Sequence, residues 1–168
     1  MPGGDNRHRY VCVRGETIHY QNPRIVAGRV PVWEGQILLC KRAIEPRYGY
    51  WTLPAGFMEN AETTMEAAAR ETREEALAEV TIHGLYSIID VPHINQVHMF
   101  YRATLTDGQF GAGQESLESK LFTPDDIPWD EISFPTVRKT LELFLNDMKS
   151  DSYGVHIKDI RHPMAKKS

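Results

Sequence analysis

The segment from Glu59 to Glu79 concentrates negative charge in a stretch with the composition of a helix. It contains seven glutamates and only two arginines, Arg70 and Arg73. Residues 63–77 are rich in Ala and Glu and hold few helix breakers, so the pattern predicts a helix there. The turn sequence LPAGF, residues 53–57, comes shortly before it. Whatever fold the chain adopts must therefore accommodate an acidic helix beside a glycine turn.

The acids and the small residues of this helix fall on different faces. At about 100° per residue, Glu71, Glu74 and Glu75 share one face, and each like-charge pair costs about 0.2–0.5 kcal/mol. We expect a second face to lie on the core while the acids project elsewhere; its members are Met65, Ala68, Ala69, Thr72 and Ala76. Two interpretations remain: a solvated, salt-bridged surface, or a site for Mg²⁺ or Mn²⁺, which prefer carboxylate oxygens. No His or Cys lies in the cluster, which argues against zinc there.

The remaining pattern places strands on both sides of this helix. Apolar and β-branched runs predict strands at 24–33, 36–42, 80–91 and 96–106, with a short one at 119–122. Glu34 and Gly35 form the expected hairpin turn. A second helix is predicted from the spacing of Val137, Leu141, Phe144, Leu145 and Met148, with Pro135 in its first turn. The order predicts an α+β fold, an α/β/α sandwich with a mixed sheet between helices.

Length and composition indicate one domain of an ordinary globular protein. The 168 residues divide into an N-terminal segment at 1–23, a domain at 24–148 and a C-terminal tail at 149–168. A net charge of −4 provides no basic field for nucleic acid. No apolar run approaches the roughly 20 residues that span a membrane, and the N-terminus lacks the apolar region of a secretory signal. We therefore expect a cytoplasmic protein whose two cysteines stay as thiols.

The acidic segment also carries a spaced motif. Gly56 is followed after five residues by Glu62, after seven more by Arg70–Glu71, and after two more by Glu74–Glu75. This spacing resembles the Nudix box, and these six positions match it. The end of the box departs from the family pattern: Thr72 and Ala78 stand at bulky apolar positions, and Leu77 replaces a glycine. The family glycine suits a helix C-cap, so either Leu77 is strained there or the helix ends differently. We expect an altered helix exit more than a lost metal site, because no ligand is changed.

The resemblance implies a fold, an activity and a set of site residues. Nudix enzymes hydrolyse nucleoside diphosphates linked to another moiety, on a mixed sheet sandwiched between helices. By resemblance, Glu71, Glu74 and Glu75 would hold Mg²⁺ or Mn²⁺, and the carbonyl of Gly56 or its neighbour Ala55 would assist. Arg70 would orient a box glutamate through a charge-assisted hydrogen bond, and Glu62 would be structural.

In several Nudix enzymes the base or a further metal ligand lies on a later loop. Glu115 and Glu118 are the candidates in this chain, and Glu115 is preferred because its spacing to Leu121–Phe122 is similar to the family's. Together with Glu74, Glu75 and Arg70, it completes the predicted catalytic set.

The chain also contains the stretches IHYQNPRIVAG, LLCKRAI, YWTLPAGFMENAET and SLESKLFTPDDIPWDEISFP. These stretches resemble the ADP-ribose and FAD pyrophosphatases, which are related to NADH pyrophosphatases. The implied reaction releases AMP from a small nucleotide substrate, and many relatives are homodimers. Candidate substrate-binding residues are Arg42, Trp51, Phe57 and Tyr101, because arginines bind phosphates and aromatic faces stack on bases. Two other functions stay open: hydrolysis of nucleoside triphosphates, and an ADP-ribose-sensing domain without catalysis.

The N-terminal segment is similar to a degenerate zinc ribbon. Members of this subgroup often carry two C-x-x-C pairs there, whereas this chain retains Cys12 and has Gly15 at the partner position. Four N or S ligands make a tetrahedral zinc site, so we expect no zinc in this segment. Cys40, within a predicted strand, is expected to be a core residue.

Overall fold

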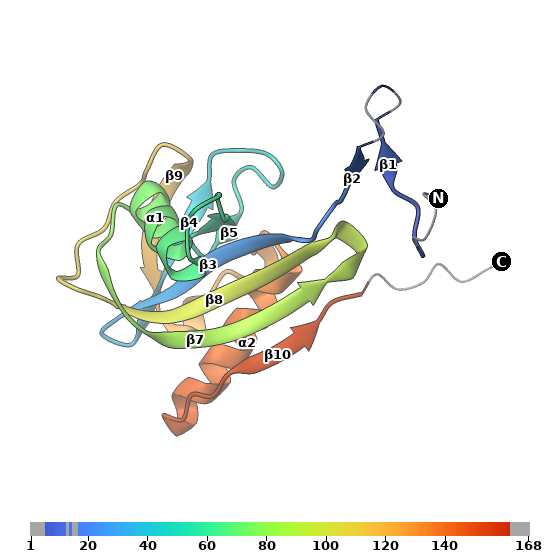
Figure 1. The fold of residues 1–168 in the computed structure, drawn as a ribbon. Coiled ribbons are helices and arrows are strands. Elements are labelled where there is room, and N and C mark those ends of the chain that lie inside the picture. Colours follow the sequence, from blue (N-terminus) through green and yellow to red (C-terminus); the bar gives the residue numbers. More distant parts are fainter. Residues whose placement is uncertain (1–5, 13, 15–16, 162–168) are drawn as a thin grey trace.

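A computed structural model describes residues 6–12, 14 and 17–161 of the chain. Figure 1 shows helices packed on a twisted sheet, with a small separate sheet near the N-terminus. The elements are β1 (Tyr10–Val11), β2 (Ile18–His19), β3 (Arg24–Trp33), β4 (Gln36–Arg42), β5 (Trp51–Thr52), β6 (Ala55–Phe57), α1 (Thr64–Ala76), β7 (Val80–Val91), β8 (Gln96–Leu105), β9 (Ser116–Phe122), α2 (Pro135–Ser150) and β10 (His156–Asp159). Short 3₁₀ turns lie at Pro92–Ile94, Pro124–Asp126 and Trp129–Glu131.

The main sheet has eight strands and is mixed, as predicted. Its order is β10-β7-β8-β3-β4-β5, with β6 pairing with β3 and β9 pairing with β4. β3 is parallel to β8 and β10 is parallel to β7, while the other pairs are antiparallel. The predictions for β3, β4 and β7 have the observed bounds, whereas β9 begins three residues earlier than expected.

The turn between β3 and β4 follows from its sequence. Trp33 pairs with Gln36, so Glu34 and Gly35 are the two loop residues. Both have positive φ, 48° and 75°. A two-residue hairpin with positive φ at both positions matches the right-handed twist of the flanking strands. The predicted hairpin is therefore confirmed.

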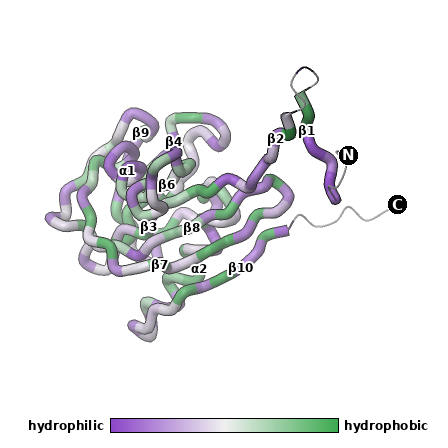
Figure 2. Tube along the Cα trace, viewed as in Figure 1, coloured by the Kyte–Doolittle hydropathy of each residue, from purple (hydrophilic) through white to green (hydrophobic). Residues whose placement is uncertain are grey.

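The two helices cover opposite faces of the sheet, because neighbouring strand residues point to opposite sides. On β8, Phe100 belongs to a core cluster with Val137, Leu141 and Phe144 of α2. The next residue, Tyr101, belongs to a cluster with Ala67 and Ala68 of α1. Figure 2 shows hydrophobic segments along the strands and hydrophilic ones in the connections. The predicted α+β sandwich is confirmed.

The C-terminal segment joins this body after residue 148. α2 continues to Ser150, and β10 then pairs with residues 87–90 of β7. Asp147 accepts hydrogen bonds from the Tyr86 hydroxyl (2.8 Å) and pairs with His156 Nε2 (2.7 Å). This contact connects α2, β7 and β10. The sequence predicted no strand here, because four residues with three exposed side chains carry no alternation signal.

The N-terminal segment forms a two-stranded antiparallel sheet, in which Tyr10 pairs with His19. Cys12 is exposed, and Gly15 lies outside the described residues. Cys40 is buried in the core beside Leu38, as expected. Among the described residues, no helix is long and apolar enough to cross a membrane.

His98 is a buried titratable group between β8 and α2. Its Nδ1 lies 2.7 Å from Thr136 Oγ1 and its Nε2 lies 2.8 Å from Gln96 Oε1. Burial lowers the pKa of His98 from 6.5 to about 4. The folded protein therefore holds this imidazole neutral where the unfolded chain would already bind a proton.

We predict a loss of stability between pH 6.5 and 4 that depends on His98. Because the folded pKa lies below the unfolded value, the unfolded state binds the proton first and stability falls as pH falls. The loss should reach up to about 3 kcal/mol and level off below about pH 4. Urea unfolding across this range should show a steeper decline for the wild type than for His98→Gln. Parallel curves would contradict the prediction.

Candidate active site

The acidic helix α1 begins with a capping box. Thr63 Oγ1 accepts from the Glu66 amide (3.2 Å), and the Glu66 carboxylate accepts from the Thr63 amide (2.7 Å). These bonds satisfy two amide groups that lack partners within the helix. They fix where the helix starts, and with it the direction in which the residues of its later turns point.

Two of the three predicted metal-binding glutamates are buried, which corrects the expected faces of the helix. Glu71 and Glu75 are 8% and 6% exposed, and only Glu74 projects outward. Met65, expected in the core, is 47% exposed. The predicted apolar face was thus rotated: the small residues Ala68, Thr72 and Ala76 are buried as expected, but the acids at 71 and 75 share that inward side.

The buried carboxylates lie against the turn that precedes the helix. The Ala55 amide donates to Glu75 Oε2 at 3.0 Å. A Cβ at Gly56 would overlap the Glu71 carboxylate, so only glycine allows this approach. The glycine turn and the acidic helix that the sequence places side by side therefore meet in space.

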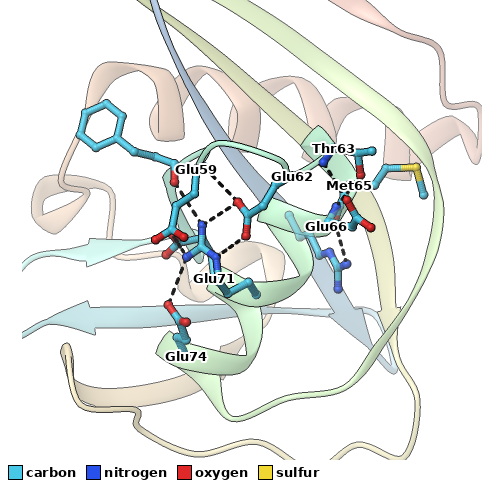
Figure 3. A network of polar contacts seen from close by, with 10 residues as sticks. Glu59, Glu62, Thr63, Met65, Glu66, Glu71 and Glu74 are labelled. Carbon is cyan, nitrogen blue, oxygen red and sulfur yellow. Dashed lines mark hydrogen bonds and ion pairs between the residues drawn. The ribbon is translucent and has the colours of Figure 1, made fainter.

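Arg70 is the cation that binds Glu62, Glu71 and Glu74. Figure 3 shows these three glutamates with their carboxylates turned toward one another. Arg70 donates to Glu62 from Nε (2.6 Å) and Nη2 (3.0 Å). Its Nη1 reaches Glu71 Oε1 (2.6 Å) and Glu74 Oε2 (3.2 Å), and its Nη2 also donates to the Phe57 carbonyl (3.2 Å). Arg70 therefore holds three box glutamates and the turn together. Glu62 in turn accepts from the Glu59 amide (3.0 Å), so it anchors Arg70 to the loop.

The electrostatics of the cluster favour an added cation. Burial, then the charges of neighbouring glutamates, raise the pKa of Glu71 although Arg70 opposes the shift. Burial, together with the charges of Glu71 and Glu115, raises the pKa of Glu75 to about 8. In contrast, the hydrogen bonds from Arg70 and the Glu59 amide lower the pKa of Glu62 to about 2. Negative charge is thus crowded where the two buried carboxylates lie.

These residues have the donor chemistry of a site for a hard divalent cation. Among the described residues, no group of three His, Cys, Asp or Glu side chains converges closely enough to hold a metal ion. Glu71, Glu74 and Glu75 supply only carboxylate oxygens, which suit Mg²⁺ or Mn²⁺. Glu71 and Glu75 are the two whose mutual repulsion a cation would relieve. Glu74 presents its carboxylate at the surface beside them, held by Arg70.

Of the two candidate acids outside the box, Glu115 lies nearer the buried carboxylates. Its charge raises the pKa of both Glu71 and Glu75. Glu118 sits on β9 opposite Lys41, and both acids are exposed. The placement favours Glu115 as the additional acid, and its role stays a prediction.

The four candidate substrate-binding residues occupy different environments. Trp51 is buried in the core, where its ring packs edge-on against Phe122 at 4.8 Å. Tyr101 is buried under α1 with its hydroxyl 2.5 Å from Thr64 Oγ1. These rings present no open face to a base, so their expected stacking role does not agree with the structure. Phe57 is 45% exposed. Arg42 is 9% exposed, with Nε donating to the Pro46 carbonyl (2.9 Å).

Phe57 borders a pocket of about 310 Å³ directly beside the box. The Arg24 guanidinium lies over its ring, 5.0 Å from the centroid. The pocket is also lined by Met58 and Asn60 from the turn that leads into α1. This recess combines an exposed aromatic ring, a cation and proximity to the acidic cluster.

Sequence reasoning missed the contribution of the loop between β8 and β9. The amides of Gly111 and Gly113 donate to the carbonyls of Ala76 (2.7 Å) and Glu75 (3.0 Å) at the end of α1. The available signal was the G-x-G pattern two residues before a candidate acid. Such a pattern marks a backbone that approaches another closely.

The fold and the acidic site together define the class of protein. A NUDIX domain model matches residues 23–144, and the chain belongs to the Nudix family. It is a pyrophosphohydrolase of that family, consistent with the sandwich fold and the box residues.

Several proteins are similar to this chain. A NUDIX hydrolase of known structure from Nitrosomonas europaea is 48% identical, with a TM-score of 0.93 over 96% of this chain and 92% of its own. An ADP-ribose pyrophosphatase from Methanocaldococcus jannaschii is 30% identical over 65% of this chain and 67% of its own. An NAD-capped RNA hydrolase NudC from Vibrio vulnificus is 30% identical over 84% of this chain, which spans 54% of that protein.

The C-terminal end of α1 shows how the chain accommodates Leu77 in place of the box glycine. Of the two expectations, the strained leucine is observed and the altered helix exit is not: Leu77 itself is the C-cap in the left-handed conformation, with φ 47° and ψ 36°. Its amide donates to the Arg73 carbonyl at 3.0 Å. The helix therefore ends in the geometry that glycine adopts easily, with a leucine held at a cost of about 1–2 kcal/mol.

We predict that Leu77→Gly stabilises the protein by up to about 1 kcal/mol. Relief of the left-handed backbone should outweigh the added freedom of glycine in the unfolded chain, and little packing is lost because Leu77 is 60% exposed. Thermal unfolding should show a rise of roughly 2–4 °C. Leu77→Ala is the control, since it keeps a Cβ at positive φ. Equal stabilisation by both variants would contradict a backbone origin.

Proposed function

We propose that this protein hydrolyses the pyrophosphate bond of a nucleoside diphosphate linked to another moiety, with Mg²⁺ as the cofactor. ADP-ribose or FAD is the proposed substrate, with AMP as one product. The observation that carries the proposal is the meeting of Glu71 and Glu75 with the turn at residues 55–57. The same turn opens onto the Phe57 pocket, so a nucleotide lying there would have its phosphates beside the acidic cluster.

The chemistry requires that charge be neutralised and that water be activated. Bound Mg²⁺ would supply charge neutralisation and lower the pKa of a coordinated water. Glu71, Glu74 and Glu75 are the residues that would hold it, and Arg70 fixes Glu71 and Glu74 in orientation. We assign proton acceptance from the attacking water to Glu115, an exposed carboxylate near this cluster.

The Phe57 pocket supports a base-containing substrate. Aromatic rings stack on bases, and the Arg24 guanidinium above Phe57 shows that this ring face already accommodates a planar cation. Arg24 would have to shift, or pair with the substrate, for a base to use the same face. The similarity to an ADP-ribose pyrophosphatase supports the choice of ADP-ribose.

Product analysis tests the proposal directly. We expect chromatography to show AMP after incubation with Mg²⁺ and ADP-ribose or FAD, and no AMP when a chelator is added. NADH and nucleoside triphosphates provide the comparison set, since a triphosphate would yield a monophosphate and pyrophosphate. Release of pyrophosphate from a nucleoside triphosphate, with no turnover of ADP-ribose or FAD, would overturn the substrate assignment. Binding of ADP-ribose without turnover of any compound would favour a sensing domain.

We predict that Glu75→Gln lowers kcat by about 10²-fold or more while the fold persists. Burial already raises the pKa of the Glu75 carboxyl group to about 8, so a neutral amide is easily accommodated at this position. Without metal, the variant should therefore be at least as stable as the wild type. Added Mg²⁺ should stabilise the wild type against heat and should stabilise the variant much less. Glu142→Gln, an exposed change on α2, is the matched control. An undiminished kcat at saturating Mg²⁺ would remove Glu75 from the catalytic set.

A further inference from the structure

The loop at residues 106–115, between β8 and β9, lies on the C-terminal end of α1. The Gly111 amide donates to the Ala76 carbonyl and the Gly113 amide to the Glu75 carbonyl. The last carbonyls of a helix have no partner within the helix, and they are commonly satisfied by the residues that follow it in sequence. Here a segment more than 30 residues further along the chain satisfies two of them.

This contact depends on the absence of side chains. A Cβ at Gly113 would overlap the Glu74 carbonyl, and a Cβ at Gly108 would overlap the Trp33 indole. A Cβ at Gly111 would lie 3.3 Å from Leu77 Cδ1, tighter than an ordinary contact. Phe110, between these glycines, packs on the core cluster that contains Ala76. The loop is therefore docked on α1 by backbone contact and by one aromatic side chain.

The docked glycine fixes the start of β9 and the residue before it. The Gly113 carbonyl accepts from the Ser116 amide (3.1 Å), which closes a turn around Glu115. The Glu115 carbonyl accepts from the Ala43 amide at the end of β4 (2.8 Å). The backbone of Glu115 is thus held between the end of α1 and the end of β4. One helix turn carries Glu74 and Glu75 as side chains and, through its carbonyls, receives the loop that presents Glu115.

We propose that Gly113 is a positioning residue for catalysis, because its docking on the Glu74–Glu75 backbone sets the place of the Glu115 carboxylate relative to the buried box glutamates. The inference rests on the proposed function, in which Glu115 acts beside those glutamates. A displacement of the loop would change the position of Glu115 relative to the cluster without substituting a box residue. The position of Glu115 is therefore coupled to the backbone at the end of α1.

A double-mutant cycle on Gly113→Ala and Glu115→Gln tests the proposal. Gly113→Ala should lower kcat by about 10–100-fold, as expected when a catalytic group is misplaced, and change KM little. In the Glu115→Gln background the same change should have almost no further effect, because the displaced group is already inactive. Gly154→Ala is the matched control, since a Cβ there meets nothing within 4 Å. Multiplicative losses in the double variant would overturn the proposal.

The same double-mutant cycle can be measured without catalysis, as the affinity of each protein for Mn²⁺ alone. Loss of the Glu115 charge beside Glu71 and Glu75 should weaken Mn²⁺ binding by about 3–10-fold. Gly113→Ala should weaken it by a similar factor, and the double variant no more than either. A wild type that binds Mn²⁺ with this pattern but releases no AMP would refute the proposed function and leave the positioning intact. Unchanged Mn²⁺ affinity and kcat in Glu115→Gln would overturn the positioning role while hydrolysis by the wild type stands.

A milder pair of variants covers the case in which Gly113→Ala does not fold. Gly111→Ala places a Cβ against Leu77 and should lower kcat by a factor of about 2–5, in proportion to a small shift of the loop. Leu77→Ala removes the opposing side-chain atoms and should restore the rate in the double variant. Failure of this rescue, with both variants folded, would show that the loop does not act through its contact with the helix end.

Discussion

The site depends on the burial of two like charges, those of Glu71 and Glu75, between a helix and the turn that precedes it. A buried carboxylate is costly unless it is hydrogen-bonded or paired. Arg70 and the Ala55 amide supply part of that compensation, and the raised pKa of both groups shows that it is incomplete. The protein without a cation is thus held in an electrostatically unfavourable arrangement. A divalent ion placed among these carboxylates would gain the interaction energy that the fold leaves unsatisfied.

The neighbouring elements can be understood as supports for that arrangement. The capping box sets the start of α1, Glu62 anchors Arg70, and Gly56 leaves room for the Glu71 carboxylate. At the other end of the helix, two loop amides donate hydrogen bonds to carbonyls that have no partner within the helix. These supports hold the backbone, Arg70 and the Glu71 carboxylate in place, and Glu71, Glu74 and Glu75 remain available as oxygen donors. A site in which negative charge is crowded needs such rigidity, because mobile carboxylates would separate.

The regular elements and the box spacing could be predicted from the sequence, because alternation and helical periodicity are local signals. The faces of α1 could not. A helical wheel places Glu71, Glu74 and Glu75 together and suggests that all three avoid the core, whereas the turn at 55–57 folds over two of them and provides an amide and a glycine. The same limit applies to Trp51 and Tyr101, since composition does not show that both faces of the sheet are covered. β10 and the docking of the β8–β9 loop were missed because they depend on contacts between distant segments.

Leu77 shows how a departure from a family pattern can be compatible with a site. A glycine at this position would end the helix without strain, and the chain instead holds a leucine at positive φ. That leucine lies against Gly111, so the residue lacking a side chain is on the loop and not on the helix. The Gly111 amide is close enough to the helix end to donate to the Ala76 carbonyl at 2.7 Å. We therefore interpret Leu77 and Gly111 as a coupled pair, in which the strain of one is balanced by the loop docking that the other permits.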